Sequence, residues 1–140
     1  MRYQFTEDTA LVESAKEIAA LGSDTLKIAL TSKYVDDYLM EPDSEIQSVL
    51  DLVQKKPSFL QVMDMPFRNV MLWVYPFCDS KAALSGGEMS DADASAIYQE
   101  MYELTDYLLK RYSGSGKSFF LGNWEGDWHL QNEKYDYDLD

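Results

Sequence analysis

Hydrophobic residues change their spacing along the chain, and this spacing predicts the elements. Apolar residues three or four positions apart predict helices, whereas short continuous apolar runs predict buried strands. The first helix is expected over residues 7–21, with Thr6 as its N-cap and Gly22 as its stop. A second helix is expected to begin at a capping box formed by Ser44 and Gln47. A further helical turn is expected to start at Pro57 and to end before Pro66. A long helix is expected from Ser90 to about Arg111.

Strands are predicted between these helices, at residues 25–30, 69–76 and 118–121. The run at 69–76 is nearly continuous in apolar residues, as expected of a strand that is covered on both faces. Residues 31–43 are expected to form a loop. The alternation of helix and strand predicts an α/β fold whose parallel strands are joined by right-handed crossovers.

Polar and aromatic residues follow each predicted strand. In a parallel sheet the carboxyl ends of the strands meet at one edge, where ligands bind. Tyr75 stands at the end of the second strand and shares a face with Trp73, which we expect in the core rather than on the floor of a site. The residues after the first strand are Thr31, Ser32, Lys33 and Tyr34, with Asp36 and Asp37 beyond them.

The third strand runs into residues 122–128, Gly-Asn-Trp-Glu-Gly-Asp-Trp. Paired carboxylates supply acid–base catalysis on glycosidic bonds, and an Asn side chain can orient a sugar hydroxyl. Aromatic faces can stack on flat ligands. The alternative is a tight turn held by packed tryptophans, with its acids in solvent. Composition alone does not separate the two interpretations.

The chain is strongly acidic, because 25 Asp and Glu residues against 12 Lys and Arg residues give a formal net charge of −13. Such a chain is repelled by nucleic-acid phosphates and by anionic membrane surfaces, so neither is expected as a partner. No apolar run approaches the ~20 residues that span a bilayer. The single cysteine, Cys78, precludes an intrachain disulfide.

No cofactor and no metal are expected from the sequence. His129 is the only histidine, and it lacks further ligands at a suitable spacing. The glycine-rich segment 112–118 lacks the first Gly of a phosphate-binding loop and joins a helix to a strand, the reverse of the order such a loop needs. We expect a turn there. Cys78 has no neighbour in the sequence that marks it as an activated nucleophile.

A longer stretch carries a family resemblance. From Leu104 to Trp128 the chain has a Tyr-Leu-Leu helix end, a Gly-Ser-Gly-Lys turn and an Asn-Trp-Glu-Gly-Asp-Trp strand end. This stretch resembles a group of glycoside-hydrolase-like TIM-barrel proteins, as do residues 20–30 and 66–75. The resemblance implies that the strands are the second to fourth of eight. The chain would then be a parallel-sheet fragment of a (β/α)8 TIM barrel, one partial domain over residues 1–140.

The resemblance also implies roles for the last motif. Glu125 would be the catalytic general acid/base, and Asn123 would assist by orienting a substrate hydroxyl. Trp124 separates these two residues, whereas barrel glycosidases commonly place them side by side. The residues expected to bind the sugar are Trp124, Trp128, Tyr75 and Asp127.

These observations predict a fragment of a glycoside hydrolase that acts on a carbohydrate ligand. We expect the fragment to be inactive alone, because glycoside hydrolysis needs a second carboxylate, which such barrels carry on a late strand. The alternative functions are a non-catalytic carbohydrate-binding module and a protein-interaction module that self-associates through open sheet edges.

Overall fold

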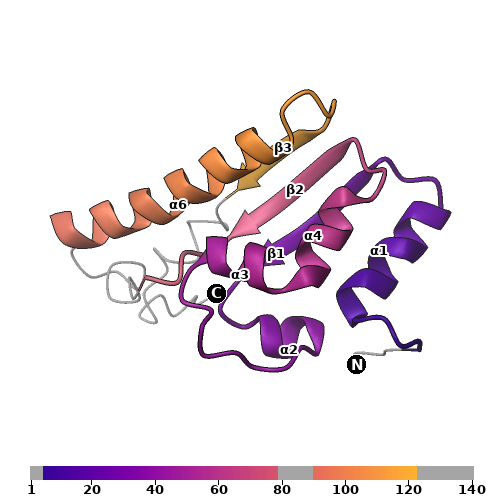
Figure 1. Cartoon of the computed structure of the whole chain (residues 1–140), viewed down its shortest axis with the longest axis horizontal. Coiled ribbons are helices and arrows are strands. Elements are labelled where there is room, and N and C mark those ends of the chain that lie inside the picture. Colours follow the sequence, from indigo (N-terminus) through magenta and orange to yellow (C-terminus); the bar gives the residue numbers. More distant parts are fainter. Residues whose placement is uncertain (1–4, 79–89, 123–140) are drawn as a thin grey trace, which may run out of the picture.

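The computed structural model describes residues 5–78 and 90–122, which form an α/β fold with a three-stranded, all-parallel open sheet (Figure 1). Helices and strands alternate as the hydrophobic pattern predicts. The elements in chain order are α1 (Ala10–Ala20), β1 (Thr25–Leu30), α2 (Tyr34–Tyr38), α3 (Val49–Lys55), α4 (Pro57–Asp64), β2 (Asn69–Val74), α6 (Asp91–Arg111) and β3 (Ser118–Gly122).

The strands lie across the sheet in the order of the sequence, β1-β2-β3. Leu26 of β1 lies opposite Val70 of β2, which in turn lies opposite Phe119 of β3. Right-handed crossovers that always step in the same direction place their helices on the same face of a sheet. The sheet therefore has one helix-covered face and one open face.

The helix-covered face holds the hydrophobic core. Every second residue of β1 and β2 is buried, and α6 closes the core over β3, where the rings of Tyr112 and Phe119 lie 4.8 Å apart. The most deeply buried core side chains from the helices, each at 0 or 1% exposure, are Val12 and Ala15 of α1, Val49, Leu52 and Val53 of α3, Phe59, Val62 and Met63 of α4, and Leu104 of α6.

The open face carries no helix in the part of the chain that the structure describes. On neighbouring strands, Met71 is 41% exposed and Phe120 is 51% exposed, whereas Leu72 on the covered face is fully buried. The expectation that residues 69–76 are covered on both faces is therefore wrong. The uncovered positions of β2 are occupied by the apolar residues Met71 and Trp73, so the sequence shows no polar–apolar alternation although burial alternates along the strand. The open face comprises Thr25, Lys27, Ala29, Asn69, Met71, Trp73, Ser118, Phe120 and Gly122.

The first helix begins at Ala10, later than the expected residue 7. Its N-cap is Thr9, whose hydroxyl accepts a hydrogen bond from the Val12 N–H, so the assignment of Thr6 as the cap is wrong. The Thr6 hydroxyl instead accepts from the Asp8 N–H in the turn before the helix. The predicted stop at Gly22 is confirmed, because this residue has a φ of 84°.

Two expectations in the segment between β1 and α4 are also wrong. The helix expected to open at Ser44 begins instead after Ser48, whose hydroxyl accepts from the Asp51 N–H. The side chain of Gln47 donates to the Ser44 carbonyl and caps no helix. Residues 31–43, expected to be a loop, contain the short helix α2. A helix of five residues is too short to show an apolar period.

The helices on either side of β2 match their predicted starts. α4 begins at Pro57, and Ser90 caps α6 in a capping box with Asp93. The glycine-rich segment after α6 is the expected helix-to-strand turn, with Gly114 and Gly116 at positive φ. None of the described helices is long and apolar enough to cross a membrane.

Candidate functional site

A cavity of about 470 Å³ lies over the carboxyl ends of β1 and β2, on the open side of the sheet. This is the edge at which parallel α/β sheets bind ligands. The glycine-rich turn lies at the other end of the strands. The cavity combines aromatic, hydroxyl and charged side chains, and its lining residues are Ala29, Thr31, Lys33, Asp37, Tyr38, Trp73 and Tyr75.

The turn after β1 brings Lys33 and Asp37 to this cavity. The buried Thr31 accepts hydrogen bonds from the Lys33 N–H through its hydroxyl and from the Tyr34 N–H through its carbonyl. These bonds start α2. The Asp37 N–H donates to the Lys33 carbonyl at 2.8 Å, so the two residues lie one helical turn apart on the same side of α2. The sequence-predicted residues Thr31, Lys33 and Asp37 are thus brought together.

Tyr34, also singled out after the first strand, does not line the cavity. Its side chain is buried, and its phenol oxygen accepts a hydrogen bond from the Asp43 N–H at 2.9 Å. It holds the segment after α2 against the core instead.

Tyr38 forms the corner between α2 and the edge of β1. Its hydroxyl accepts from the Ala29 N–H at 2.8 Å and donates to the Ala29 carbonyl at 3.0 Å. The phenol thus occupies the position that a neighbouring strand would take. Burial raises the pKa of Tyr38, so the hydroxyl stays protonated and able to donate.

Trp73 lies on the open face beside Lys27. The Lys27 ammonium stands 3.5 Å from the centroid of the Trp73 ring, a cation–π contact between neighbouring strands. Trp73 is only partly covered and lines the cavity, so it lies outside the core that the described helices cover. Its expected place in the core of a barrel stays a prediction. On its other side Gly122 of β3 lies opposite it, and a Cβ there would reach the Trp73 ring at 3.7 Å.

Tyr75 continues the line of Trp73 one step beyond the end of β2. Its N–H donates to the Leu30 carbonyl at 2.8 Å, which extends the ladder past Val74. The side chain lines the cavity, at the strand end where the sequence places it. Its role as a sugar contact stays a prediction.

The rest of the sequence-predicted site follows Gly122 directly and lies outside the described residues. These positions are Asn123, Trp124, Glu125, Asp127 and Trp128, together with His129. Their assigned roles stay predictions. Because Gly122 lies opposite Trp73, the described chain ends on the strand next to the cavity, one residue before Asn123.

Glu100 of α6 holds the backbone beyond β2, a role that no sequence pattern indicates. One carboxylate oxygen accepts from the N–H groups of Val49 and Phe77, at 3.1 and 3.0 Å, and the other accepts from the Cys78 N–H at 2.6 Å. The same carboxylate and burial raise the pKa of the Cys78 thiol, with burial the larger cause, to about 11. At neutral pH this cysteine is therefore a thiol and a poor nucleophile.

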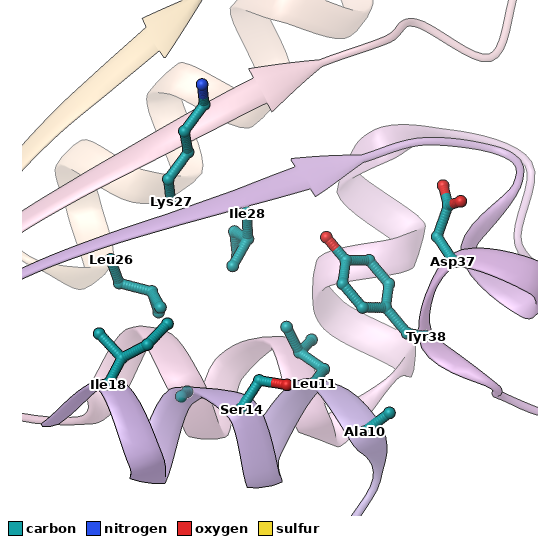
Figure 2. Close-up of a pocket in the computed structure, with 10 residues that line it drawn as sticks. Ala10, Leu11, Ser14, Ile18, Leu26, Lys27, Ile28, Asp37 and Tyr38 are labelled. Carbon is teal, nitrogen blue, oxygen red and sulfur yellow. The ribbon is translucent and has the colours of Figure 1, made fainter. Parts of the chain in front are cut away.

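A second cavity, of about 320 Å³, runs between α1 and the free edge of β1 (Figure 2). Its floor is apolar: Figure 2 shows Leu26 and Ile28 pointing towards α1 and Leu11, whereas Lys27 points to the other side of the strand. Asp37 and Tyr38 line both cavities and separate them. The polar strand-end cavity is the better candidate for a site, because it gathers groups that can form hydrogen bonds.

The chemistry open to the strand-end cavity is binding through stacking and hydrogen bonds. Among the described residues no group of three or more His, Cys, Asp or Glu side chains could hold a metal ion. Asp37 is the single carboxylate among the described lining residues. The described lining of this cavity therefore does not contain the pair of carboxylates that glycoside hydrolysis needs.

No protein-family profile, curated protein or solved structure matches the chain. The α/β fold with its parallel sheet and the strand-end cavity therefore rest on the structure alone.

Proposed function

We propose that the chain is part of a carbohydrate-active (β/α)8 enzyme and that its strand-end cavity binds a saccharide. The observation that carries the proposal is the one-sided sheet. Consecutive parallel strands with the described helices α1, α3, α4 and α6 on one face match the wall of a barrel, whose inner face is the open one. Each half of a doubly wound sheet has the same arrangement, and such a sheet differs from a barrel wall only beyond the point where its strand order reverses.

The lining of the cavity supports a saccharide as the ligand. Small-molecule sites combine aromatic surface with a few placed polar groups. Trp73 and Tyr75 supply aromatic surface for the C–H face of a sugar ring, and the Thr31 hydroxyl, the Lys33 ammonium and the Asp37 carboxylate supply hydrogen-bonding groups. Both aromatic residues stand on the open face at the carboxyl end, as barrel enzymes require.

The proposed catalytic group is Glu125, which would protonate the glycosidic oxygen as general acid and then act as base. Asn123 would orient a sugar hydroxyl beside it, and Trp124, Asp127 and Trp128 would contact the sugar. The position of Gly122 beside Trp73 supports this proposal, because the chain enters the motif from the strand next to the cavity. A second carboxylate is needed for turnover, so the chain alone is expected to bind without cleaving.

Calorimetric titration of the chain with a panel of neutral and acidic oligosaccharides tests the binding proposal. We expect at least one to bind, and Tyr75→Ala to weaken it about tenfold through lost stacking. The matched control is Tyr98→Ala, since Tyr98 is 67% exposed on α6 and away from the cavity. Binding by none of the panel, or equal losses in both variants, would overturn the proposal.

The second candidate function is a non-catalytic carbohydrate-binding module, or a protein-interaction module that self-associates through its open sheet. The lone carboxylate of the described cavity favours binding without catalysis, and the exposed side chains of Met71 and Phe120 favour association. Two measurements separate the candidates. Loss of bond cleavage on Glu125→Gln in the full-length protein supports the enzyme, and sedimentation of the chain at rising concentration detects self-association.

A further inference from the structure

Two cations on the open side of the sheet have no carboxylate partner among the described residues, although the chain as a whole is acidic. Lys27 and Lys33 form no ion pair with any residue that the structure describes. The other basic side chains of the described part are mostly neutralised. Those with a carboxylate partner are Lys16, Lys55, Lys56, Lys110 and Arg111.

One of these cations, Lys33, lines the strand-end cavity, and the other, Lys27, lines the cavity beside α1 and reaches the strand-end cavity only through its contact with Trp73. The Lys27 ammonium lies over the ring of Trp73, which lines the strand-end cavity. Trp73 pairs with Ala29, which stands two positions after Lys27 on β1, so the Lys27 side chain leans towards the carboxyl end of the sheet. Figure 2 shows the Lys27 side chain pointing away from α1, so that it stands on the open side of the sheet. Arg68, which also forms no ion pair with the described residues, precedes β2 at the opposite end.

An ammonium held against an aromatic ring is a preformed site for a negative group. The ring stabilises the charge from one side only, which leaves N–H donors of the Lys27 ammonium on the other side for a ligand. Hydrogen bonds from an ammonium to a carboxylate or sulfate are about twice as strong as neutral ones. Asp37 is the one described lining residue that would oppose an anion, and it lies on α2 next to Lys33.

We infer that the saccharide bound in this cavity is an acidic one, whose carboxylate or sulfate pairs with the Lys27 ammonium beside Trp73 while its ring lies against Tyr75. Lys27 is then a specificity-determining residue, and Lys33 supports it from the rim. The inference rests on the proposed function, since it names the substrate class of the same site.

The test compares acidic oligosaccharides with the same compounds after their charge is removed. Oligogalacturonates are titrated calorimetrically beside their carboxyl-reduced forms, and sulfated disaccharides beside their desulfated forms. The chain is expected to bind one acidic form about tenfold more tightly than its uncharged partner, as one charge-assisted hydrogen bond predicts. The pair that shows the difference tells a carboxylate ligand from a sulfate ligand.

The variants assign the preference to one side chain. Lys27→Met is expected to remove the preference for the acidic form over the uncharged form, and Lys27→Arg is expected to retain it. Lys110→Met is the matched control, because Lys110 is an exposed residue of α6 that pairs with Asp106. If Lys27→Met fails to fold by circular dichroism, the wild-type comparison and Lys33→Met decide the matter.

The outcomes separate this inference from the proposed function. Equal binding of charged and uncharged forms would overturn the inference and leave the saccharide site standing. An equal loss in Lys27→Met and Lys110→Met would also overturn it. Binding of no saccharide in either form would overturn both.

Discussion

Tyr38 illustrates how one side chain can close a sheet edge. β1 has a partner on one side only among the described residues, and a free edge exposes N–H and C=O groups that invite another chain. The Tyr38 hydroxyl satisfies both groups of Ala29, and its ring packs edge-on against Phe59 with the centroids 5.5 Å apart. One phenol therefore ties α2 both to the strand and to the core.

Tyr38→Phe is expected to lower the free energy of unfolding by about 1–2 kcal/mol, because two backbone groups of Ala29 lose their partner while the ring stays. Urea titration followed by circular dichroism measures the change. Tyr98→Phe serves as the control, since the exposed Tyr98 side chain shows a ring contact with Tyr102 and no hydrogen bond of its hydroxyl. A change below about 0.3 kcal/mol in Tyr38→Phe would contradict the role of the hydroxyl.

Cys78 offers a second check at the residue scale. The thiolate is the form that reacts, and burial with the neighbouring Glu100 carboxylate raises the pKa of this thiol to about 11. Alkylation of the folded chain by iodoacetamide at pH 8 is therefore expected to be at least about tenfold slower than alkylation of the chain in urea. Because Cys78 is the single cysteine, the total incorporated label reports on it alone. Equal rates would show that the thiol is not shielded.

The residues of the site differ in how far the sequence could reveal them. The sequence alone could indicate four of them, Thr31, Lys33, Asp37 and Tyr75, because each follows a strand and the carboxyl ends of parallel strands gather at one edge of the sheet. Tyr38 and Lys27 could not be predicted as site residues. The hydrogen bonds of Tyr38 depend on α2, which is too short to carry a period, and Lys27 belongs to the site only through Trp73 on another strand.

At the scale of elements, Glu100 joins α6, α3 and the backbone after β2 through one carboxylate. Glu100→Gln replaces one acceptor oxygen by a donor that faces N–H groups. We expect a loss of about 2–3 kcal/mol in the free energy of unfolding, since bonds to a charged acceptor are lost. Glu103→Gln on the same helix is the control, because Glu103 accepts only from the Gln99 side chain at the surface. Similar values for the two variants would contradict this account of Glu100.

The two faces of β2 make a further prediction at this scale. Leu72→Ala removes a fully buried side chain and is expected to cost about 2–5 kcal/mol, whereas Met71→Ala on the open face should cost less than about 1 kcal/mol. Chemical denaturation of both variants measures the difference. A large loss in Met71→Ala would mean that the open face is covered in the folded protein.

The elements themselves were largely predictable, because long amphipathic helices and short apolar strands differ in period. Each of β1, β2, β3, α4 and α6 lies where the pattern places it. The starts of α1 and α3 were not predictable. Two Thr residues, Thr6 and Thr9, precede α1, two Ser residues, Ser44 and Ser48, precede α3, and the choice between them depends on packing. The burial of β2 also escaped prediction, because a continuous apolar run conceals which residues are covered.

At the scale of the whole molecule, the decisive feature is that the described helices α1, α3, α4 and α6 lie on one face of a sheet whose strands keep the order of the sequence (Figure 1). The alternation of elements predicted the parallel sheet. Strand order was not predictable from it, because the same alternation gives doubly wound sheets as well as barrels. The open face, its unpaired cations and the aromatic cavity at the carboxyl ends follow from this order.

Whether the strand-end cavity is a saccharide site is tested most directly by mapping binding on the labelled chain. Nuclear magnetic resonance spectra of ¹⁵N-labelled protein are recorded as the tightest-binding oligosaccharide of the panel is added. We predict that the shifts concentrate on the Trp73 indole N–H and on the backbone N–H groups of Thr31, Lys33 and Tyr75. Shifts confined to α6 and β3, or no shifts at saturating saccharide, would contradict the proposed site.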